Sequence, residues 1–297
     1  MDWLECVPNV SEGRRLDAVA RLVAAAVSAP GVRLLDVSSD PDHNRSVLTL
    51  AGDAEALHRS LLALYGAALA EIDLTRHQGV HPRVGAVDVV PFVPLGDTPM
   101  AAAVAAAERL AREVAERFAL PVYLYEQAAR RPERRLLADI RRGGFEGLAA
   151  RIAEPAWSPD FGPARVHPGA GATVIGARFF LIAFNAVLDT PDVAVARAVA
   201  RRVRESGGGL PAVRALGVYL ASRDRAQVSM NLVDFRRTPL LAALDRVRSE
   251  AEALGARVVE TEVIGLVPEE AAFGVVRDAL QLPGFGAGRV LEGALLR

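Results

Sequence analysis

The sequence contains no lysine, since all 35 of its basic residues are arginine. Lysine provides the amine of Schiff-base enzymes, the anchor of pyridoxal phosphate and the phosphate-binding side chain of a Walker A loop. The missing residue type therefore excludes these three kinds of site.

Cysteine, net charge and long apolar runs are also scarce. The single cysteine, Cys6, cannot form an internal disulfide, so nothing requires an oxidising compartment. The formal charge of −1 argues against a dedicated nucleic-acid binder. No apolar run reaches the roughly 18 residues of a membrane span, and the chain does not open with a basic segment followed by an apolar one. We expect an unprocessed, cytoplasmic protein that binds neither nucleic acid nor membranes.

The chain is long and apolar enough for two hydrophobic cores. It has 297 residues, 51% of them hydrophobic, which suits two domains of about 150 residues. In the first half, the pattern predicts strand, helix, strand, strand, helix and strand at residues 4–10, 16–28, 32–37, 46–50, 54–72 and 86–93. This βαββαβ order is typical of a ferredoxin-like split βαβ arrangement.

The same order of elements recurs in the second half. The six elements are expected at residues 179–188, 192–205, 215–221, 226–233, 239–254 and 257–266, before a closing helix at 269–280. The sequence thus predicts an α/β (α+β) protein with two tandem ferredoxin-like βαββαβ subdomains and mixed or antiparallel sheets, at residues 1–178 and 179–297.

Additional elements are expected between the two repeats. Residues 100–118 have helical spacing, residues 122–125 form a short strand, and the polar segment 134–152 suits a helix. Residues 154–171 are dense in proline and glycine, which indicates a long loop between the halves.

Two of the five histidines, His77 and His81, lie in residues 76–88. Gly79 and Pro82 oppose a helix there, so the two imidazoles are not arranged as a helical zinc-binding pair, and we expect no metal. Histidine is the side chain that exchanges a proton near neutral pH. His81 is therefore either a general acid or base on a shaped loop or a hydrogen-bonded loop residue, whereas His77 suits a helix C-cap or the surface.

Other segments leave alternatives open. The glycines of residues 169–176 lack the spacing of a dinucleotide fingerprint, and they either bring backbone amides close to a ligand or shape a connector. Cys6 suits a small buried core position. Asn9 and Ser11, near the end of the first strand, are both competent helix N-caps. We call residues 76–88 the histidine loop. Arg45 and Arg83 would bind carboxylates together if both lay beside this loop.

Several segments, taken together, resemble the glutamate formiminotransferases. They are residues 5–13, 81–88, 91–92, 160–163, 176–178, 180–185 and 226–232. The resemblance implies transfer of the formimino group from N-formimino-L-glutamate to N5 of tetrahydrofolate, a late step of histidine breakdown. It also implies two ferredoxin-like subdomains, tetrahydrofolate as co-substrate, no metal or nucleotide, and a homodimer. Because the chain ends near residue 297, we expect the monofunctional form without a cyclodeaminase domain.

The resemblance also assigns roles to residues. It implies that His81, in a His-Pro-Arg motif, is the catalytic residue. The loop that contacts folate corresponds to Gly162, Pro163, Ala164, Arg165, Val166, His167, Pro168, Gly169, Ala170 and Gly171. Within it, His167 is either a second ring contact or a loop residue. Substrate binding is expected of Asn9, Asn44, Arg45, Arg83 and Arg178.

In the expected mechanism, N5 attacks the amidine carbon and His81 moves a proton from N5 to the leaving nitrogen of glutamate, using an ordinary imidazole pKa. One alternative is related folate chemistry, either formyl transfer from N-formylglutamate or a reaction like that of 5-formyltetrahydrofolate cyclo-ligase. Another, of a different class, is a non-catalytic ferredoxin-like module that binds a small ligand.

Overall fold

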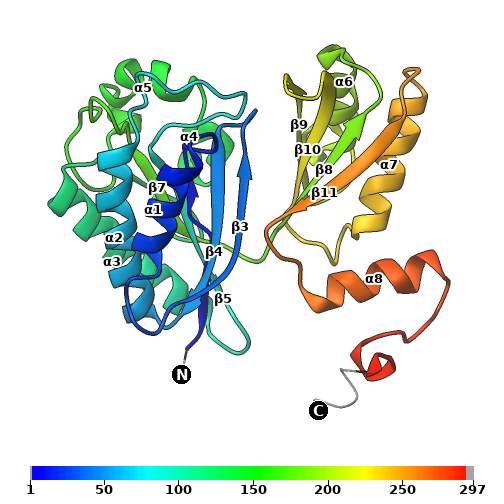
Figure 1. Ribbon diagram of the computed structural model, residues 1–297, viewed down its shortest axis with the longest axis horizontal. Helices are drawn as coiled ribbons and strands as arrows, with labels where there is room; N and C mark the ends of the chain where they lie inside the picture. The colour runs from blue at the N-terminus through cyan, green and yellow to red at the C-terminus, as the bar shows by residue number, and fades with distance from the viewer. Residues whose placement is uncertain (1, 292–297) are drawn as a thin grey trace. The chain divides into compact units, whose positions relative to one another are not determined.

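A computed structural model describes residues 2–291, and the chain divides into two compact units, Met1–Phe179 and Phe180–Arg297 (Figure 1). Each unit has its own sheet and its own apolar core. Among the described residues, no helix is long and apolar enough to cross a membrane.

The first unit builds a seven-stranded sheet. Its elements in chain order are β1 (Leu4–Cys6), β2 (Asn9–Val10), α1 (Leu16–Ala26), β3 (Arg33–Asp40), β4 (Arg45–Gly52), α2 (Ala54–Glu71), β5 (Val87–Pro94), α3 (Met100–Phe118), β6 (Val122–Glu126), α4 (Leu137–Ile140), α5 (Gly144–Ile152) and β7 (Thr173–Ala177). Short 3-10 helices lie at Pro132–Arg134 and Pro155–Trp157. The strand expected at residues 4–10 is split into β1 and β2 around Pro8, which has no backbone N–H to donate.

The strand order of this unit is ferredoxin-like. With β1 and β2 counted as one strand, the order is β5, β1/β2, β4, β3, and each neighbouring pair is antiparallel. This confirms the fold predicted for the first βαββαβ repeat. Beyond β5 the sheet is extended, because β7 pairs parallel with β5 and β6 pairs parallel with β7.

Two segments differ from the sequence-based expectation. No strand is expected among the glycines of residues 169–176, which suggest either a ligand-contacting backbone or a connector. Residues 173–177 instead form a fully buried parallel strand, for which the β-branched residues Thr173, Val174 and Ile175 are well suited. The single helix expected at residues 134–152 is wrong as well. Gly143 and Gly144 have φ angles of 83° and 63°, which separate α4 from α5.

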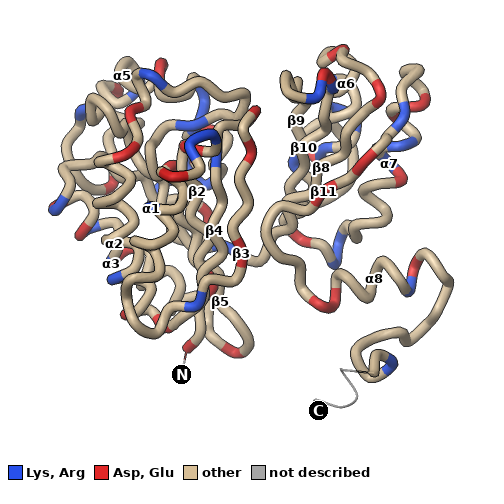
Figure 2. Tube along the Cα trace, in the orientation of Figure 1, with Lys and Arg blue, Asp and Glu red and all other residues tan. Residues whose placement is uncertain are grey.

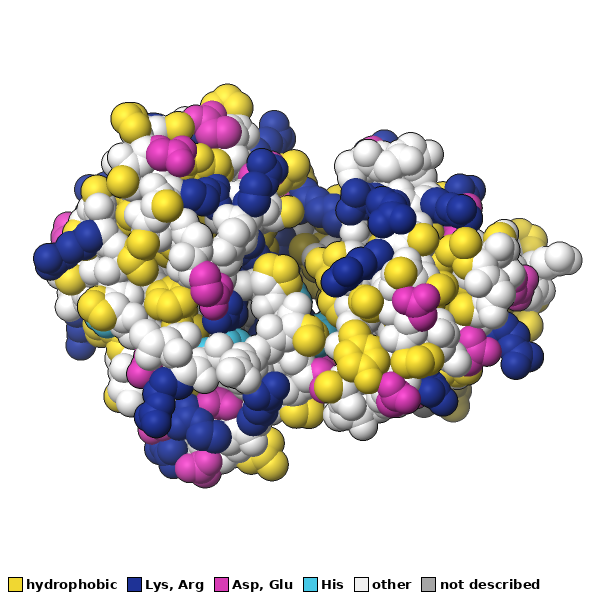
Figure 3. Space-filling view, turned by 90° about the horizontal axis from the view of Figure 1, so that it is seen from above, with side chains coloured by type: hydrophobic (Ala, Val, Ile, Leu, Met, Phe, Trp, Pro, Cys, Tyr) yellow, Lys and Arg dark blue, Asp and Glu magenta, His cyan; other side chains and the backbone are white. Residues whose placement is uncertain are grey.

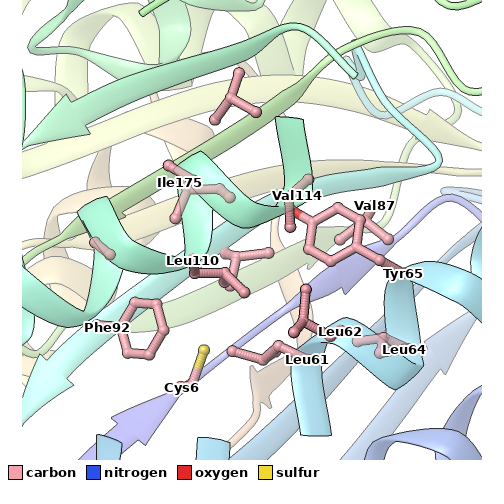
Figure 4. Close-up of a cluster of buried hydrophobic side chains, with 14 of the residues drawn as sticks. Cys6, Leu61, Leu62, Leu64, Tyr65, Val87, Phe92, Leu110, Val114 and Ile175 are labelled. Atoms are coloured by element: carbon pink, nitrogen blue, oxygen red, sulfur yellow. The ribbon is translucent and has the colours of Figure 1, made fainter. Parts of the chain in front are cut away.

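The main core of the first unit lies between the sheet and α1, α2 and α3. Figure 4 shows Cys6 of β1 and Phe92 of β5 near Leu61 of α2 and Leu110 of α3. The core position expected for Cys6 is confirmed, and burial raises the pKa of its thiol well above the ordinary value. A smaller cluster on the other face of the sheet packs Tyr123 and other strand residues against α4 and α5.

The second unit is the smaller version of the same fold. Its elements are β8 (Ile182–Leu188), α6 (Val193–Val203), β9 (Val213–Leu220), β10 (Arg225–Leu232), α7 (Leu240–Glu252), β11 (Val258–Ile264) and α8 (Glu269–Ala279), with 3-10 helices at Glu205–Gly207 and Ala287–Arg289. The strand order is β11, β8, β10, β9, and all pairs are antiparallel. The second predicted ferredoxin-like repeat is therefore confirmed.

Candidate active site

The polar loops of the first unit meet at one end of its sheet, at the top in Figure 1. The turn at residues 41–44 joins β3 to β4, and the loop at residues 73–86 joins α2 to β5. The two are closely packed, since a Cβ on Gly79 would lie 2.3 Å from His43 O. Figure 2 shows basic and acidic residues interspersed at this end, and Figure 3 looks down on histidines beside arginines.

His81 has both ring nitrogens engaged. Its Nδ1 lies 2.9 Å from Pro82 O, and its Nε2 lies 2.7 Å from Arg45 Nη1. A carbonyl oxygen only accepts and a guanidinium only donates, so we assign the ring proton to Nδ1 and the acceptor lone pair to Nε2. The ring of His43 lies beside it, with 5.5 Å between the ring centroids. His81 is thus held as one tautomer, with its basic nitrogen toward Arg45.

The surroundings hold the pKa of His81 well below its ordinary value of 6.5. Burial is the largest cause, and the charges of Arg45, Arg141 and His43 add to it. The expectation of an ordinary imidazole pKa is therefore wrong, and the ring is a free base at neutral pH. Burial and the charge of Arg141 also lower the pKa of Arg45, to about 10, which leaves this guanidinium charged at neutral pH.

Asp88 fastens the histidine loop to α4. Its carboxylate is 2% exposed and accepts hydrogen bonds from Val84 N–H at 2.7 Å and Gly85 N–H at 3.3 Å. Its other oxygen pairs with the guanidinium of Arg141, just after α4. The buried carboxylate therefore orders the loop and also partly balances the basic charges around His81.

His77 and Arg83 brace the loop from another side. Arg83 Nε donates to His77 Nδ1 at 2.9 Å, and its guanidinium pairs with Glu146 of α5 at 2.9 Å. His77 Nε2 donates in turn to Asn44 O at 2.8 Å. Arg45 and Arg83 therefore both lie at the histidine loop, as shared carboxylate binding would require, but they contact different histidines of that loop.

Asn44 and Asn9 direct their side chains at backbone groups. Asn44 has a φ of 47°, and its Oδ1 accepts from Gly13 N–H at 3.0 Å. Asn9 lies on β2, and its Nδ2 donates to Val7 O at 2.9 Å. The N-cap expected of Asn9 is wrong, because α1 begins only after Arg15. These contacts position the strand ends and the turn next to the histidine loop.

The loop expected to contact folate has two anchored ends. At one end, a Cβ on Gly162 would lie 2.1 Å from Leu120 O. At the other, His167 and Gly171 exchange backbone hydrogen bonds of 3.0 and 2.9 Å, and His167 Nδ1 accepts from the backbone of this turn at 3.0 Å. The residues between are half-buried or exposed, namely Pro163, Ala164, Arg165, Val166, Pro168 and Gly169.

The second end of this loop pairs with the histidine loop. Gly85 and Gly171 face each other across an antiparallel bridge, and Ala172 N–H donates to Val84 O at 2.9 Å. A Cβ on Gly85 would lie 1.8 Å from Ala172 O, and one on Gly171 would lie 2.1 Å from Val84 O. Only glycine fits at either position, so the structure brings the expected folate loop next to the residues that follow His81.

Arg178 lies at the opposite end of the sheet, just after β7. Its N–H donates to Phe92 O at 3.0 Å, and its guanidinium donates to Phe179 O at 3.0 Å. Burial raises the pKa of nearby Glu5, while the charge of Arg178 opposes that rise. The structure therefore does not bring Arg178 to the side of His81.

Comparison with known proteins identifies the family. Residues 3–178 match the N-terminal subdomain of the formiminotransferase domain, and residues 183–277 match the formiminotransferase domain. The chain belongs to the formiminotransferase family. It is 43% identical to a glutamate formimidoyltransferase of Streptococcus pyogenes over 99% of this chain and 98% of that protein.

Other formiminotransferases are similarly close. A glutamate formimidoyltransferase of Thermoplasma acidophilum is 46% identical over 98% of this chain and 97% of its own length. A formimidoyltransferase-cyclodeaminase of Gallus gallus is 43% identical over 90% of this chain, which covers 50% of that protein.

The candidate site contains two neighbours of His81 that sequence reasoning missed, Arg141 and His43. His43 is 2% exposed, and its backbone N–H donates to Asp40 Oδ1 at 2.8 Å. It stands in an Asp-His-Asn-Arg segment that is typical of any tight turn, so no local signal separates it from a turn residue. Within residues 2–291, no three His, Cys, Asp or Glu side chains are grouped to hold a metal ion.

Proposed function

We propose that this chain is a glutamate formimidoyltransferase, which moves the formimino group of N-formimino-L-glutamate to N5 of tetrahydrofolate. The similarity to glutamate formimidoyltransferases over nearly the whole chain supports the reaction. The observation that carries the mechanism is the neutral imidazole of His81, with one fixed tautomer in a basic setting.

His81 would carry the proton that the transfer requires. N5 attacks the formimino carbon to give a tetrahedral intermediate, and Nε2 takes the proton that N5 loses. The imidazolium then gives this proton to the glutamate nitrogen as its bond to carbon breaks. Burial and two arginines disfavour the imidazolium, so it releases the proton readily. Such general acid and base catalysis contributes roughly 10²- to 10⁴-fold.

Arg45 would link substrate binding to this step. In the structure its guanidinium donates to the lone pair that His81 needs as a base. A substrate carboxylate that binds Arg45 would draw the guanidinium away and partly neutralise its charge, which frees Nε2. Arg141 is a second cation close enough to affect His81, but its guanidinium already pairs with Asp88, so we assign it the role of keeping the imidazole neutral.

The remaining roles follow from position. Residues 162–171 would contact the folate, because their second end is paired with the histidine loop. Arg83, Asn9 and Asn44 would order the loops, since their side chains already have partners. Arg178 lies about 16 Å along β7 from the histidine loop, which suits a carboxylate on the folate tail rather than one at the reacting atoms.

The family resemblance also supports a setting for the enzyme. We assign it to histidine breakdown in the cytoplasm and to a homodimer that acts on small molecules. A measurement of molar mass in solution tests the homodimer.

A direct assay tests the reaction. Purified protein is incubated with tetrahydrofolate and either N-formimino-L-glutamate or N-formyl-L-glutamate, and glutamate release is followed. We expect turnover with the formimino donor. Turnover with the formyl donor alone would favour the formyltransferase alternative, and no saturable binding of 5-formyltetrahydrofolate by calorimetry would favour the non-catalytic module.

A further inference from the structure

The second unit carries a polar cluster on the face of its sheet that is turned away from α6 and α7. It consists of Asn185 on β8, Gln227 on β10 and Glu262 on β11. Glu262 lies opposite Asn185 in the strand register, and its side chain reaches over β8. Its Oε1 accepts from Asn185 Nδ2 and from Gln227 Nε2, each at 2.9 Å. Two of these residues belong to segments that resemble the family but have no role in the proton transfer.

The orientation of both amides is fixed by this arrangement. A carboxylate can only accept hydrogen bonds, so each amide must turn its NH₂ group toward Glu262 and its carbonyl oxygen away. Gln227 is 0% exposed, and its Oε1 has no hydrogen-bond partner among the described residues. Within the same residues, no donor reaches Glu262 Oε2. Among the described residues, two acceptor oxygens of the cluster therefore lack a donor, the charged Glu262 Oε2 and the buried Gln227 Oε1.

An acceptor left without a donor in this place is unfavourable for the free protein. A buried polar group without a partner destabilises a fold, and native proteins have few of them. The neighbours of Gln227 in the register are Val187 and Val218, which offer no side-chain donor. The missing N–H groups are thus best supplied by a ligand.

We propose that this cluster, which we call the acceptor site (Asn185, Gln227 and Glu262), binds a group with two N–H donors on one carbon. One donor would reach Glu262 Oε2 and the other Gln227 Oε1. The proposal rests on the proposed function, which supplies two sources of this chemistry. The formimino group of N-formimino-L-glutamate is an amidine, and the 2-amino-4-oxopyrimidine edge of the reduced pterin carries N3–H and an amino group. A formyl group has an oxygen in place of one N–H and would bind the site less well.

The test compares Glu262→Gln with Glu260→Gln. Glu260 lies on the same strand, but its carboxylate pairs with Arg223, so its replacement makes the same chemical change outside the acceptor site. Calorimetry measures binding of N-formimino-L-glutamate and of 5-formyltetrahydrofolate to the full chain. We expect Glu262→Gln to weaken one of the two by about 10- to 100-fold, because hydrogen bonds to a charged group are the strong ones, and Glu260→Gln to match the wild type.

The outcomes separate the sources and the underlying function. A loss confined to N-formimino-L-glutamate assigns the acceptor site to the formimino donor, and a loss confined to 5-formyltetrahydrofolate assigns it to the pterin. Unchanged binding of both, or a loss that Glu260→Gln shares, would overturn the acceptor site while the proposed function stands. If wild-type protein binds neither compound, the proposed function itself fails.

A second variant tests whether Gln227 serves ligand binding or only the stability of the fold. Gln227→Leu removes the buried acceptor and keeps an apolar side chain of similar length between Val187 and Val218. We expect its melting temperature to stay at or above the wild-type value while binding of the assigned ligand falls about 10-fold or more. A lower melting temperature with intact binding would show that Gln227 serves the fold and would overturn the proposal.

Discussion

The two units share one strand order but use it differently. Both arrange the strands of a βαββαβ repeat in the ferredoxin-like order, and both cover one face of the sheet with helices. The first unit adds α3, β6 and β7 and contains all five histidines of the chain, whereas the second contains none. The side chain best suited to proton transfer near neutral pH therefore occurs only in the first unit, where we propose that the transfer takes place.

The position of the polar residues differs as well. In the first unit they lie on loops at one end of the sheet, and backbone contacts such as the pairing of Gly85 with Gly171 hold these loops together. In the second unit, the acceptor site lies on three neighbouring strands. A strand fixes its side chains by its own pairing, whereas a loop needs added contacts to do so. The same strand order thus carries polar groups on loops at the end of one sheet and on the face of the other.

The largest effect is expected from removing the imidazole of the first unit. His81→Gln or His81→Ala should lower kcat by about 10²- to 10⁴-fold, because the variant removes the proposed proton carrier. Binding of 5-formyltetrahydrofolate should stay within severalfold of wild type, since the loop backbone remains. Steady-state kinetics and calorimetry measure the two quantities.

A matched histidine controls for this variant. His58 is buried on α2 of the same unit and contacts Glu113 of α3 at 2.6 Å, away from the loops. His58→Gln should keep wild-type kcat. Wild-type transfer rates in the His81 variants would contradict the mechanism.

The loop pairing of the first unit gives the next largest effect. Gly85→Ala places a Cβ against Ala172 O and should lower the free energy of unfolding by about 1–3 kcal/mol, as overpacking does. Chemical denaturation measures this change, and kcat should fall with it because the histidine loop must shift. Gly147→Ala is the control, since no neighbouring atom lies within 4 Å of its added Cβ, and it should stabilise α5 by about 0.5–1 kcal/mol. Equal stability of the two variants would mean that the loop pairing does not order the site.

The fold was readable from the sequence where periodicity and turn signals agreed. Residues 100–118 have helical spacing and form α3 with the same bounds. The sequence did not predict β7, because the glycines before it and within it indicate a loop although its β-branched residues favour a strand. A strand buried on both faces has no alternating pattern that would reveal it.

The site was only partly readable for a related reason. His81 stands in a segment whose glycines and proline indicate a shaped loop, but that pattern left its role open, and the family resemblance singled it out. Arg141 and His43 come from distant parts of the chain, and only the folded sheet brings them near. The shifted pKa of His81 depends on those neighbours and on burial, so no local pattern could predict it.

A smaller effect is expected on the pH dependence of the first unit. Arg45 lowers the pKa of His81, so Arg45→Gln should raise that pKa toward 6.5. Activity needs the free base and is lost as the pH falls through this pKa, so the acid limb of kcat/KM should move to higher pH. The exposed Arg76 of the same loop provides a control, because solvent screens its charge and Arg76→Gln should leave the limb in place. A limb that does not move in Arg45→Gln would show that Arg45 has no influence on the imidazole.

The smallest effect, close to none, is expected when the acceptor site is altered and the same pH limb is measured. Glu262→Gln should raise KM for the ligand that the site binds, but the acid limb of kcat/KM should keep its wild-type position, because the proposed mechanism assigns the proton to His81 of the other unit. A raised KM with an unmoved acid limb would distinguish a binding role of the strand face from a role in proton transfer, which a loss of activity alone could not do. If the acid limb moved in Glu262→Gln, the carboxylate of the second unit would influence the group that titrates in catalysis. The contrast between the two units would then no longer hold.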